Sequence, residues 1–267
     1  MTDGPYKAEL VRAVEAAYDA FGRGHVSAQL EVCLCPVCMT EAARKAIIAT
    51  RNDRLSVAQI RDYSHSAHGV PADPGDLRLF LPRYLEIMAE DQLVDDIGVG
   101  TELSRFGDAV RANPALFTLG ERAVLDAWAR AMMWHFAWAD TTEEGAVYTP
   151  SALLETLLCG GWALEVLTGA LDAIFDHPEL GRPGLLAFGA AVMRRPRRKH
   201  GKLAPDWFAL RYCGAEAREG VTAWLNAVAA SDGVLDLATG DAEAALWVQS
   251  FAASAGQFDA ALLPARD

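Results

Sequence analysis

Apolar side chains recur every three to four residues along most of this chain, and this spacing constrains its fold more than any other feature. Near the start, Leu10, Val14, Tyr18 and Phe21 would share one face of a helix. Proline and glycine interrupt the pattern at intervals typical of helix lengths. No segment alternates apolar and polar residues as a half-buried strand does. The sequence therefore predicts an all-α fold, either an irregular multi-helix bundle or a solenoid-like array of about ten helices.

Capping residues predict where several of these helices begin. Thr40 is a suitable N-cap for a helix that reaches about Thr50. Ser56 and Gln59 have capping-box spacing, and so do Thr118 and Glu121.

The same reasoning predicts further boundaries. Asp76 is expected to cap the next helix, which Pro82 should kink or delay towards Leu81. Thr149-Pro150 predicts a helix entry, and the pattern continues to Phe175 with a weak point at Gly160-Gly161. The remaining helices are expected at 184–193, 205–210, 215–230, 241–253 and 255–262.

The chain is long enough for one large core. It has 267 residues, of which 52% are hydrophobic, so we expect a single all-helical domain over 1–267. Sub-domain boundaries are conceivable near 140–150 or 194–204, but neither linker is long enough to require two domains.

The net charge, and the lack of a predicted membrane span or secretory signal, indicate which kinds of partner and location to expect. The net charge of −12 argues against general binding to nucleic acid or to anionic membranes. No apolar run approaches the ~20 residues that a membrane span requires, and the polar start carries no secretory signal. We therefore expect a soluble, cytoplasmic protein whose thiols stay reduced.

Three cysteines lie within six residues, and they are the main chemical feature of the sequence. Cys33, Cys35 and Cys38 include one C-x-x-C spacing, which allows two thiolates to face one metal ion. Such a cluster can supply three of the four ligands of a structural zinc ion. The candidates for the fourth ligand are His25, His65 and His68.

Two other interpretations of the cluster stay open. Cys35 and Cys38 could form a redox pair, because the cluster precedes a helix start that would lower a thiol pKa. The thiols could instead be small packed side chains. A full zinc ribbon would need a second C-x-x-C, whereas Cys159 and Cys213 are isolated.

A basic segment, Arg194–Lys202, contains six of the 24 basic residues. It is a potential site for an anionic partner, but no aromatic residue lies within it. A solvated loop between helices is the favoured interpretation.

The chain resembles a known family of proteins at three places: the Cys35-Pro36-Val37-Cys38 cluster, Tyr63 and the segment Phe80-Leu81-Pro82-Arg83. With Leu85, Glu86 and the later Glu121-Arg122-Ala123, they are similar to a family of bacterial all-helical proteins with a C-P-x-C cluster and a Phe-Leu-Pro-Arg motif. The resemblance covers roughly residues 30–135 and implies a helical fold, but no particular reaction. His65 and His68 depart from the pattern, because apolar or aromatic residues are expected there.

Arg83 in this motif has two interpretations. It could clamp a carboxylate of a ligand, or it could pair with a local acid, Glu86 or Glu90. The local pair is favoured, because most helical Arg–Glu pairs are structural surface features.

Enzyme signatures such as a Walker A loop, G-x-S-x-G and H-E-x-x-H are missing from the sequence. The favoured function is therefore a non-enzymatic protein-interaction module, with a structural zinc at the cysteine cluster. The alternative is a thiol-dependent redox or metal-dependent enzyme that uses Cys35 and Cys38.

Overall fold

The computed structural model describes residues 4–66, 73–94, 103–142, 147–194, 196–207, 210–211, 213–240 and 245–263. Within them, twelve α-helices and two short strands are found, which confirms the predicted all-α fold. The first half contains α1 (Lys7–Phe21), α2 (Glu41–Ala49), the 3-10 turn η1 (Asn52–Arg54), α3 (Val57–Ser66), α4 (Pro74–Ala89), α5 (Ser104–Ala112) and α6 (Leu119–Thr142). The second half contains α7 (Pro150–Cys159), α8 (Leu164–Phe175), α9 (Gly181–Met193), β1 (Arg197–Lys199), β2 (Lys202–Ala204), α10 (Ala215–Ala229), α11 (Asp232–Gly240), α12 (Ala245–Ala252) and the 3-10 turn η3 (Ala260–Leu262). None of the described helices combines the length and the apolar character needed to cross a bilayer.

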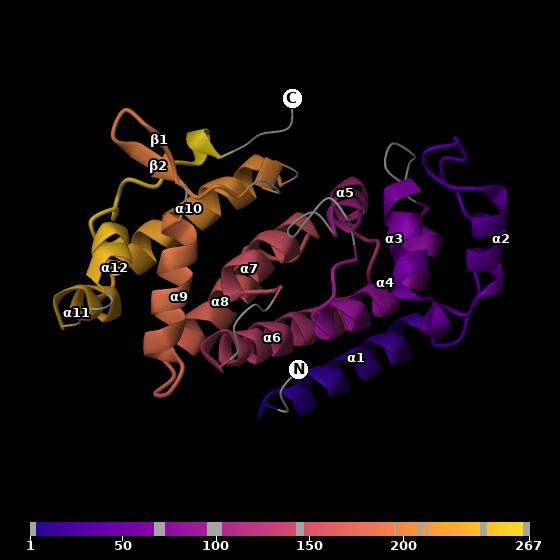
Figure 1. Ribbon diagram of the computed structural model, residues 1–267, viewed down its shortest axis with the longest axis horizontal. Coiled ribbons are helices and arrows are strands. Elements are labelled where there is room, and N and C mark those ends of the chain that lie inside the picture. The colour runs from indigo at the N-terminus through magenta and orange to yellow at the C-terminus, as the bar shows by residue number, and fades with distance from the viewer. Residues whose placement is uncertain are drawn as a thin grey trace.

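Helix α6 is the central element of the molecule. It packs against α1, α7, α8 and α9, and α1 also packs along α4. Figure 1 shows α2 and α3 at one end of the long axis and α11 and α12 at the other. One cluster of buried apolar side chains extends from Leu10 to Leu263. Whether the chain divides near 140–150 or 194–204 stays a prediction, and residues 143–146 lie outside the described part.

The predicted N-terminal caps of three helices are confirmed. The Thr40 hydroxyl accepts a hydrogen bond from the Ala43 N–H at 3.1 Å. Ser56 and Gln59 form the reciprocal bonds of a capping box, and so do Thr118 and Glu121. These signals act within one turn, so no distant part of the chain can override them easily.

Helix α4 begins earlier than predicted. Asp73, not Asp76, is its N-cap, and Pro74 occupies the first turn, where proline needs no hydrogen-bond donor. The helix continues through Pro82 to Ala89, so the delayed start expected from Pro82 is wrong. Asp76 is instead buried, and its carboxylate accepts a 2.7 Å hydrogen bond from the Ser27 hydroxyl.

The helix predicted from 150 to 175 is two helices, because it breaks at Gly160-Gly161. Gly161 has φ +89°, which an L side chain rarely adopts. Helix α5 also approaches this turn closely, since a Cβ at Gly107 would lie 1.9 Å from the Cys159 carbonyl oxygen. The break therefore allows α5, α6 and the start of α8 to meet.

The basic segment is not a plain linker. Residues 197–204 form an antiparallel hairpin in which Arg197 pairs with Ala204, so the absence of strands predicted here is wrong. His200 and Gly201 both have positive φ, as a tight two-residue hairpin turn requires. Leu203 is buried and exchanges backbone hydrogen bonds with the C-terminal segment near Phe258.

Two helix predictions in the C-terminal part are also corrected. The residues 205–207 are not helical, although a helix was expected to begin there. Helix α11 was not predicted, and α12 begins at Ala245 with residues 241–244 outside the described part. The segment after α12 contains only the short 3-10 turn η3.

Candidate metal centre

Residues 22–40 join α1 to α2 at one end of the molecule without a helix or strand, and the last part of this connection, residues 31–40, is the loop that carries the cysteine cluster. Leu30 and Met39 are buried on either side of it, with 3% and 5% of their surfaces exposed. The Cys33 N–H donates to the Ser66 carbonyl at 2.8 Å, which attaches the loop to the end of α3. The Cys38 N–H donates to the Cys35 carbonyl at 3.1 Å and closes a turn between these two residues.

This turn brings the three predicted thiols together. The Sγ atoms of Cys33, Cys35 and Cys38 all lie within 4.8 Å of one another, and each residue is partly buried. In a tetrahedral zinc site, Zn–S bonds of about 2.3 Å hold the sulfur atoms about 3.8 Å apart. The three thiols can therefore hold a metal ion with little rearrangement.

The thiols also act on one another electrostatically. A hydrogen bond from the Cys38 thiol, helped by the Val37 N–H, lowers the pKa of Cys35 to about 7. The same bond and one with Cys33 raise the pKa of Cys38 to about 12. The loop thus stabilises one thiolate next to a proton-bearing thiol, and a bound cation would take the place of that shared proton.

The predicted histidine ligands are not placed equally well. Among the described residues, the potential metal ligands whose donor atoms lie close together are the three thiols. This set includes neither His25 nor His65. His25 lies at the end of α1, where its carbonyl accepts from the Asn52 N–H at 2.7 Å. His65 lies exposed in the last turn of α3. His68 falls outside the described residues, so the identity of a fourth ligand stays a prediction.

The other two cysteines have a different environment. Cys159 and Cys213 are buried, with 0% and 5% of their surfaces exposed. Burial raises the pKa of Cys159 well above its usual range and raises the pKa of Cys213 to about 11. These thiols stay neutral at physiological pH and serve as small core side chains.

The Phe80–Arg83 motif lies in the junction of α1, α3 and α4, not in an open site. Phe80 is buried and meets Tyr63 edge to face, with ring centroids 4.8 Å apart. Arg83 binds the Glu86 carboxylate at 2.6 Å, which confirms the local pair, and its Nε donates to the Leu55 carbonyl at 2.7 Å.

Tyr18 completes this junction from α1. Its hydroxyl donates at 2.6 Å to Glu86 Oε2, the same oxygen atom that Arg83 binds. Burial, and then the bond to Glu86, raise the pKa of Tyr18 well above its usual range. The motif therefore ties three helices together, and Arg83 uses its Nε and Nη1 groups for contacts within the protein.

Asn52 was missed by the sequence reasoning, although it is fully buried in the same junction. Its amide donates to the carbonyls of Gly22 and Leu79 at 2.8 and 2.9 Å, and its Oδ1 accepts from the Gly24 N–H at 2.8 Å. One asparagine in a short polar stretch gives no pattern that could have revealed this role, because all three partners are distant in sequence.

Comparison with family models, with curated proteins and with solved structures finds no match to this chain. The resemblance that the cysteine cluster and the Phe-Leu-Pro-Arg motif carry stays a prediction.

Proposed function

We propose that this protein is a helical protein-interaction module whose N-terminal loop folds around one structural zinc ion. The observation that carries the proposal is the convergence of the Cys33, Cys35 and Cys38 sulfur atoms within 4.8 Å. Thiolate ligands favour zinc among the common divalent ions, because it is borderline soft and accepts tetrahedral sulfur donors. Reduced thiols are needed for this role, which agrees with the predicted cytoplasmic location.

A structural zinc site needs a fourth ligand. The hydrogen bond between Cys33 and Ser66 brings the end of α3 to the loop and therefore favours a ligand from that end. His65 is in the last turn of α3, and His68 follows Ser66 by two residues in the sequence. His25 is the weaker candidate, because its carbonyl accepts from the Asn52 N–H and, within the described residues, no hydrogen bond joins it to the cysteine loop.

The partner surface that we propose is the tip of this loop. Leu34 and Val37 lie between the thiols in the sequence and are 48% and 82% exposed, so two apolar side chains are presented to solvent within four residues. A metal ion would fix both side chains in one conformation and lower the entropy cost of docking. The expected partner is a protein with an apolar recess.

Metal analysis tests the proposal directly. Protein purified under reducing conditions should contain about one zinc ion per chain, and cobalt substitution should give thiolate charge-transfer and tetrahedral ligand-field bands. Cys35→Ser should lose the metal, whereas the buried-thiol control Cys213→Ala should keep it. Single alanine variants of His65, His68 and His25 identify the fourth ligand. A chain that binds neither zinc nor cobalt would refute the metal site.

The alternative is a thiol-dependent redox enzyme. It is favoured by the same proximity of Cys35 and Cys38 and by their partial exposure. Peptide mass mapping after mild oxidation distinguishes the two functions. A reversible Cys35–Cys38 disulfide in protein that never contained metal would support the redox enzyme and contradict the zinc site.

A further inference from the structure

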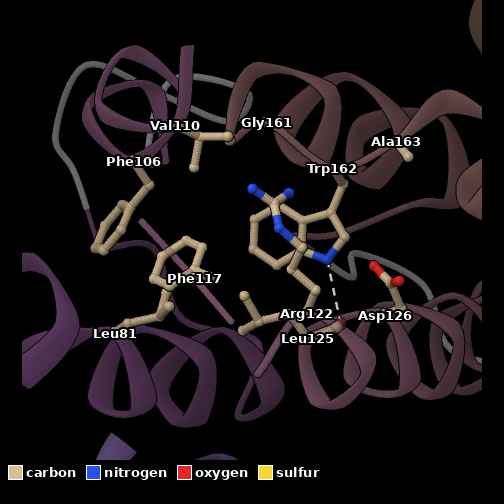
Figure 2. Close-up of a pocket in the computed structure, with 11 residues that line it drawn as sticks. Leu81, Phe106, Val110, Phe117, Arg122, Leu125, Asp126, Gly161, Trp162 and Ala163 are labelled. Carbon is tan, nitrogen blue, oxygen red and sulfur yellow. Dashed lines mark hydrogen bonds between the residues drawn. The ribbon is translucent and has the colours of Figure 1, made fainter. Parts of the chain in front are cut away.

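A small pocket lies where α5, α6 and the Gly160–Ala163 turn meet, far in sequence from the cysteine loop. Its cavity has a volume of about 120 Å³. Six apolar side chains form most of its wall: Leu81, Phe106, Val110, Phe117, Leu125 and Trp162. Figure 2 shows these side chains around the pocket, with the two charged side chains Arg122 and Asp126 rising from α6.

The size of the cavity limits its occupant. An apolar cavity of about 150 Å³ is large enough to bind benzene, so this pocket accepts a group slightly smaller than a benzene ring. It is too small for a nucleotide or a large cofactor, which need cavities of about 300 Å³ or more. A branched aliphatic group of leucine size fits.

The pocket is formed by the fold without a ligand. The Trp162 indole N–H donates to the Leu125 carbonyl at 3.1 Å, as the dashed line in Figure 2 marks. Gly161 lies close to Gly107 and Val110 with a positive φ, which holds the turn in place. A preformed site of this kind loses little entropy on binding.

Two opposite charges line the pocket, one turn apart on α6. The Arg122 guanidinium donates to the backbone carbonyl of Pro114, and no ion pair within the described residues neutralises it. Asp126 is partly buried and makes no hydrogen bond in the same part of the chain. Burial raises the pKa of Asp126, and the charges of Arg130 and Arg122 oppose this shift without cancelling it.

The start of α8 adds a second feature that suits an anion. Ala163, the residue before α8, lines the pocket, and its side chain cannot cap the helix. The Val166 N–H donates to the Ala163 carbonyl, so the N–H groups of Leu164 and Glu165 are the ones in this turn that remain open to an acceptor within the described residues, and the helix dipole favours negative charge there.

We infer that this pocket binds a small zwitterion with a branched apolar tail, such as the free α-amino acid leucine. The carboxylate would lie between Arg122 and the first turn of α8, and the ammonium group would bind Asp126. The tail would fill the apolar cavity. A ligand with both charges satisfies both side chains, whereas a singly charged ligand leaves one of them without a partner. The inference does not depend on the metal site.

Four probes test this by isothermal titration calorimetry and ligand-observed NMR on the full chain. Leucine carries the tail and both charges, 4-methylpentanoate lacks the ammonium group, 3-methylbutylamine lacks the carboxylate, and glycine lacks the tail. We expect saturable leucine binding with a Kd of about 0.1 to 1 mM, as suits a ligand of this size. The three other probes should bind at least about tenfold more weakly.

Variants then assign the binding to this pocket. Asp126→Asn and Arg122→Gln should each weaken leucine binding at least about tenfold, and Val110→Phe should abolish it by filling the cavity. The control Arg111→Gln removes a nearby α5 guanidinium that pairs with Asp108 and does not line the pocket, so it should bind like the wild type. Melting curves confirm that each variant is folded.

Three results would overturn the inference. They are the absence of saturable leucine binding to the wild type, equal binding of a singly charged probe, and unchanged leucine binding in folded Asp126→Asn or Val110→Phe protein.

Discussion

The cysteine loop and the Phe80–Arg83 junction both belong to the N-terminal part of the chain but are opposite in physical character. In the loop, three thiols are only partly buried and the apolar Val37 is 82% exposed. In the junction, the apolar side chains are buried, and the polar ones such as Asn52 and Arg83 are paired within the protein. The Phe80–Arg83 junction therefore stabilises the fold, whereas the thiols of the cysteine loop are not used up by contacts of this kind.

A second contrast supports this interpretation. The junction pairs its charges internally, since Glu86 accepts from both Arg83 and Tyr18. Next to it, Glu121 of α6 accepts from Arg78 and from the Thr118 N–H. The loop has only one backbone hydrogen bond, from Cys33 to Ser66, that ties its cysteines to another element within the described residues. A metal ion would supply the missing cross-links in the loop. The predictions below separate the stability of the junction from the chemistry of the loop.

The largest effect on stability is expected from Asn52→Ala. The substitution removes three hydrogen bonds, to the partly buried carbonyls of Gly22 and Leu79 and from the Gly24 N–H, and leaves a cavity at a fully buried position, so the free energy of unfolding should fall by about 3 kcal/mol. Urea unfolding measures this. The nearby control Thr50→Ala loses only exposed or partly exposed hydrogen bonds and should cost about 0.5 kcal/mol. Equal costs for the two variants would contradict the role of Asn52.

The next effect is expected at Glu121 and depends on pH. Arg78 holds the pKa of the Glu121 carboxyl below its usual range, helped by the Thr118 N–H. Because this pKa is lower in the folded state, the stabilisation is complete above the ordinary carboxyl pKa of about 4.3 and is lost as the pH falls below it. Glu121→Gln should cost about 2 kcal/mol at pH 7 and reduce the acid-induced loss of stability.

Unfolding curves between pH 3 and 7 measure this dependence. The exposed acid of α1 provides the control, since Glu9→Gln should leave both the stability and its pH dependence nearly unchanged. A steeper acid loss in Glu121→Gln than in the wild type would contradict the stated sign.

Removal of metal should act on the loop and leave the helices folded. With a chelator, helical circular dichroism should change by less than about a tenth, while proteolysis within residues 31–40 should increase at least about tenfold. The junction does not depend on the loop for its hydrogen bonds. Global unfolding by the chelator would show that the two regions are not separable.

The smallest effect on stability is expected from Val37→Asp. Its side chain is exposed, so the free energy of unfolding should change by less than about 0.5 kcal/mol, but partner binding should be lost. Partner binding is measured by cross-linking followed by mass spectrometry. The control is Leu119→Asp, which changes a similarly exposed apolar residue of α6. Loss of the same cross-linked partner in both variants would indicate a non-specific apolar contact.

Local signals in the sequence predicted much of the helical structure, and their failures are instructive. Thr40 and the two capping boxes act within three residues, so they were predictable. Asp73 and Asp76 are both suitable N-caps for α4. Asp73 takes this position because Asp76 is buried and bound to Ser27, which comes from a distant loop. The hairpin at 197–204 was missed because its stabilising bonds come from the segment near Phe258.

The sequence by itself determined the all-α class and the proximity of three thiols, because helical periodicity and a six-residue spacing are local properties. Only the tertiary structure decided that Asn52 joins three segments and that Arg122 and Asp126 border one apolar cavity. These arrangements depend on contacts between residues dozens of positions apart. Such contacts form only when the packed helices offset the entropy of bringing those segments together.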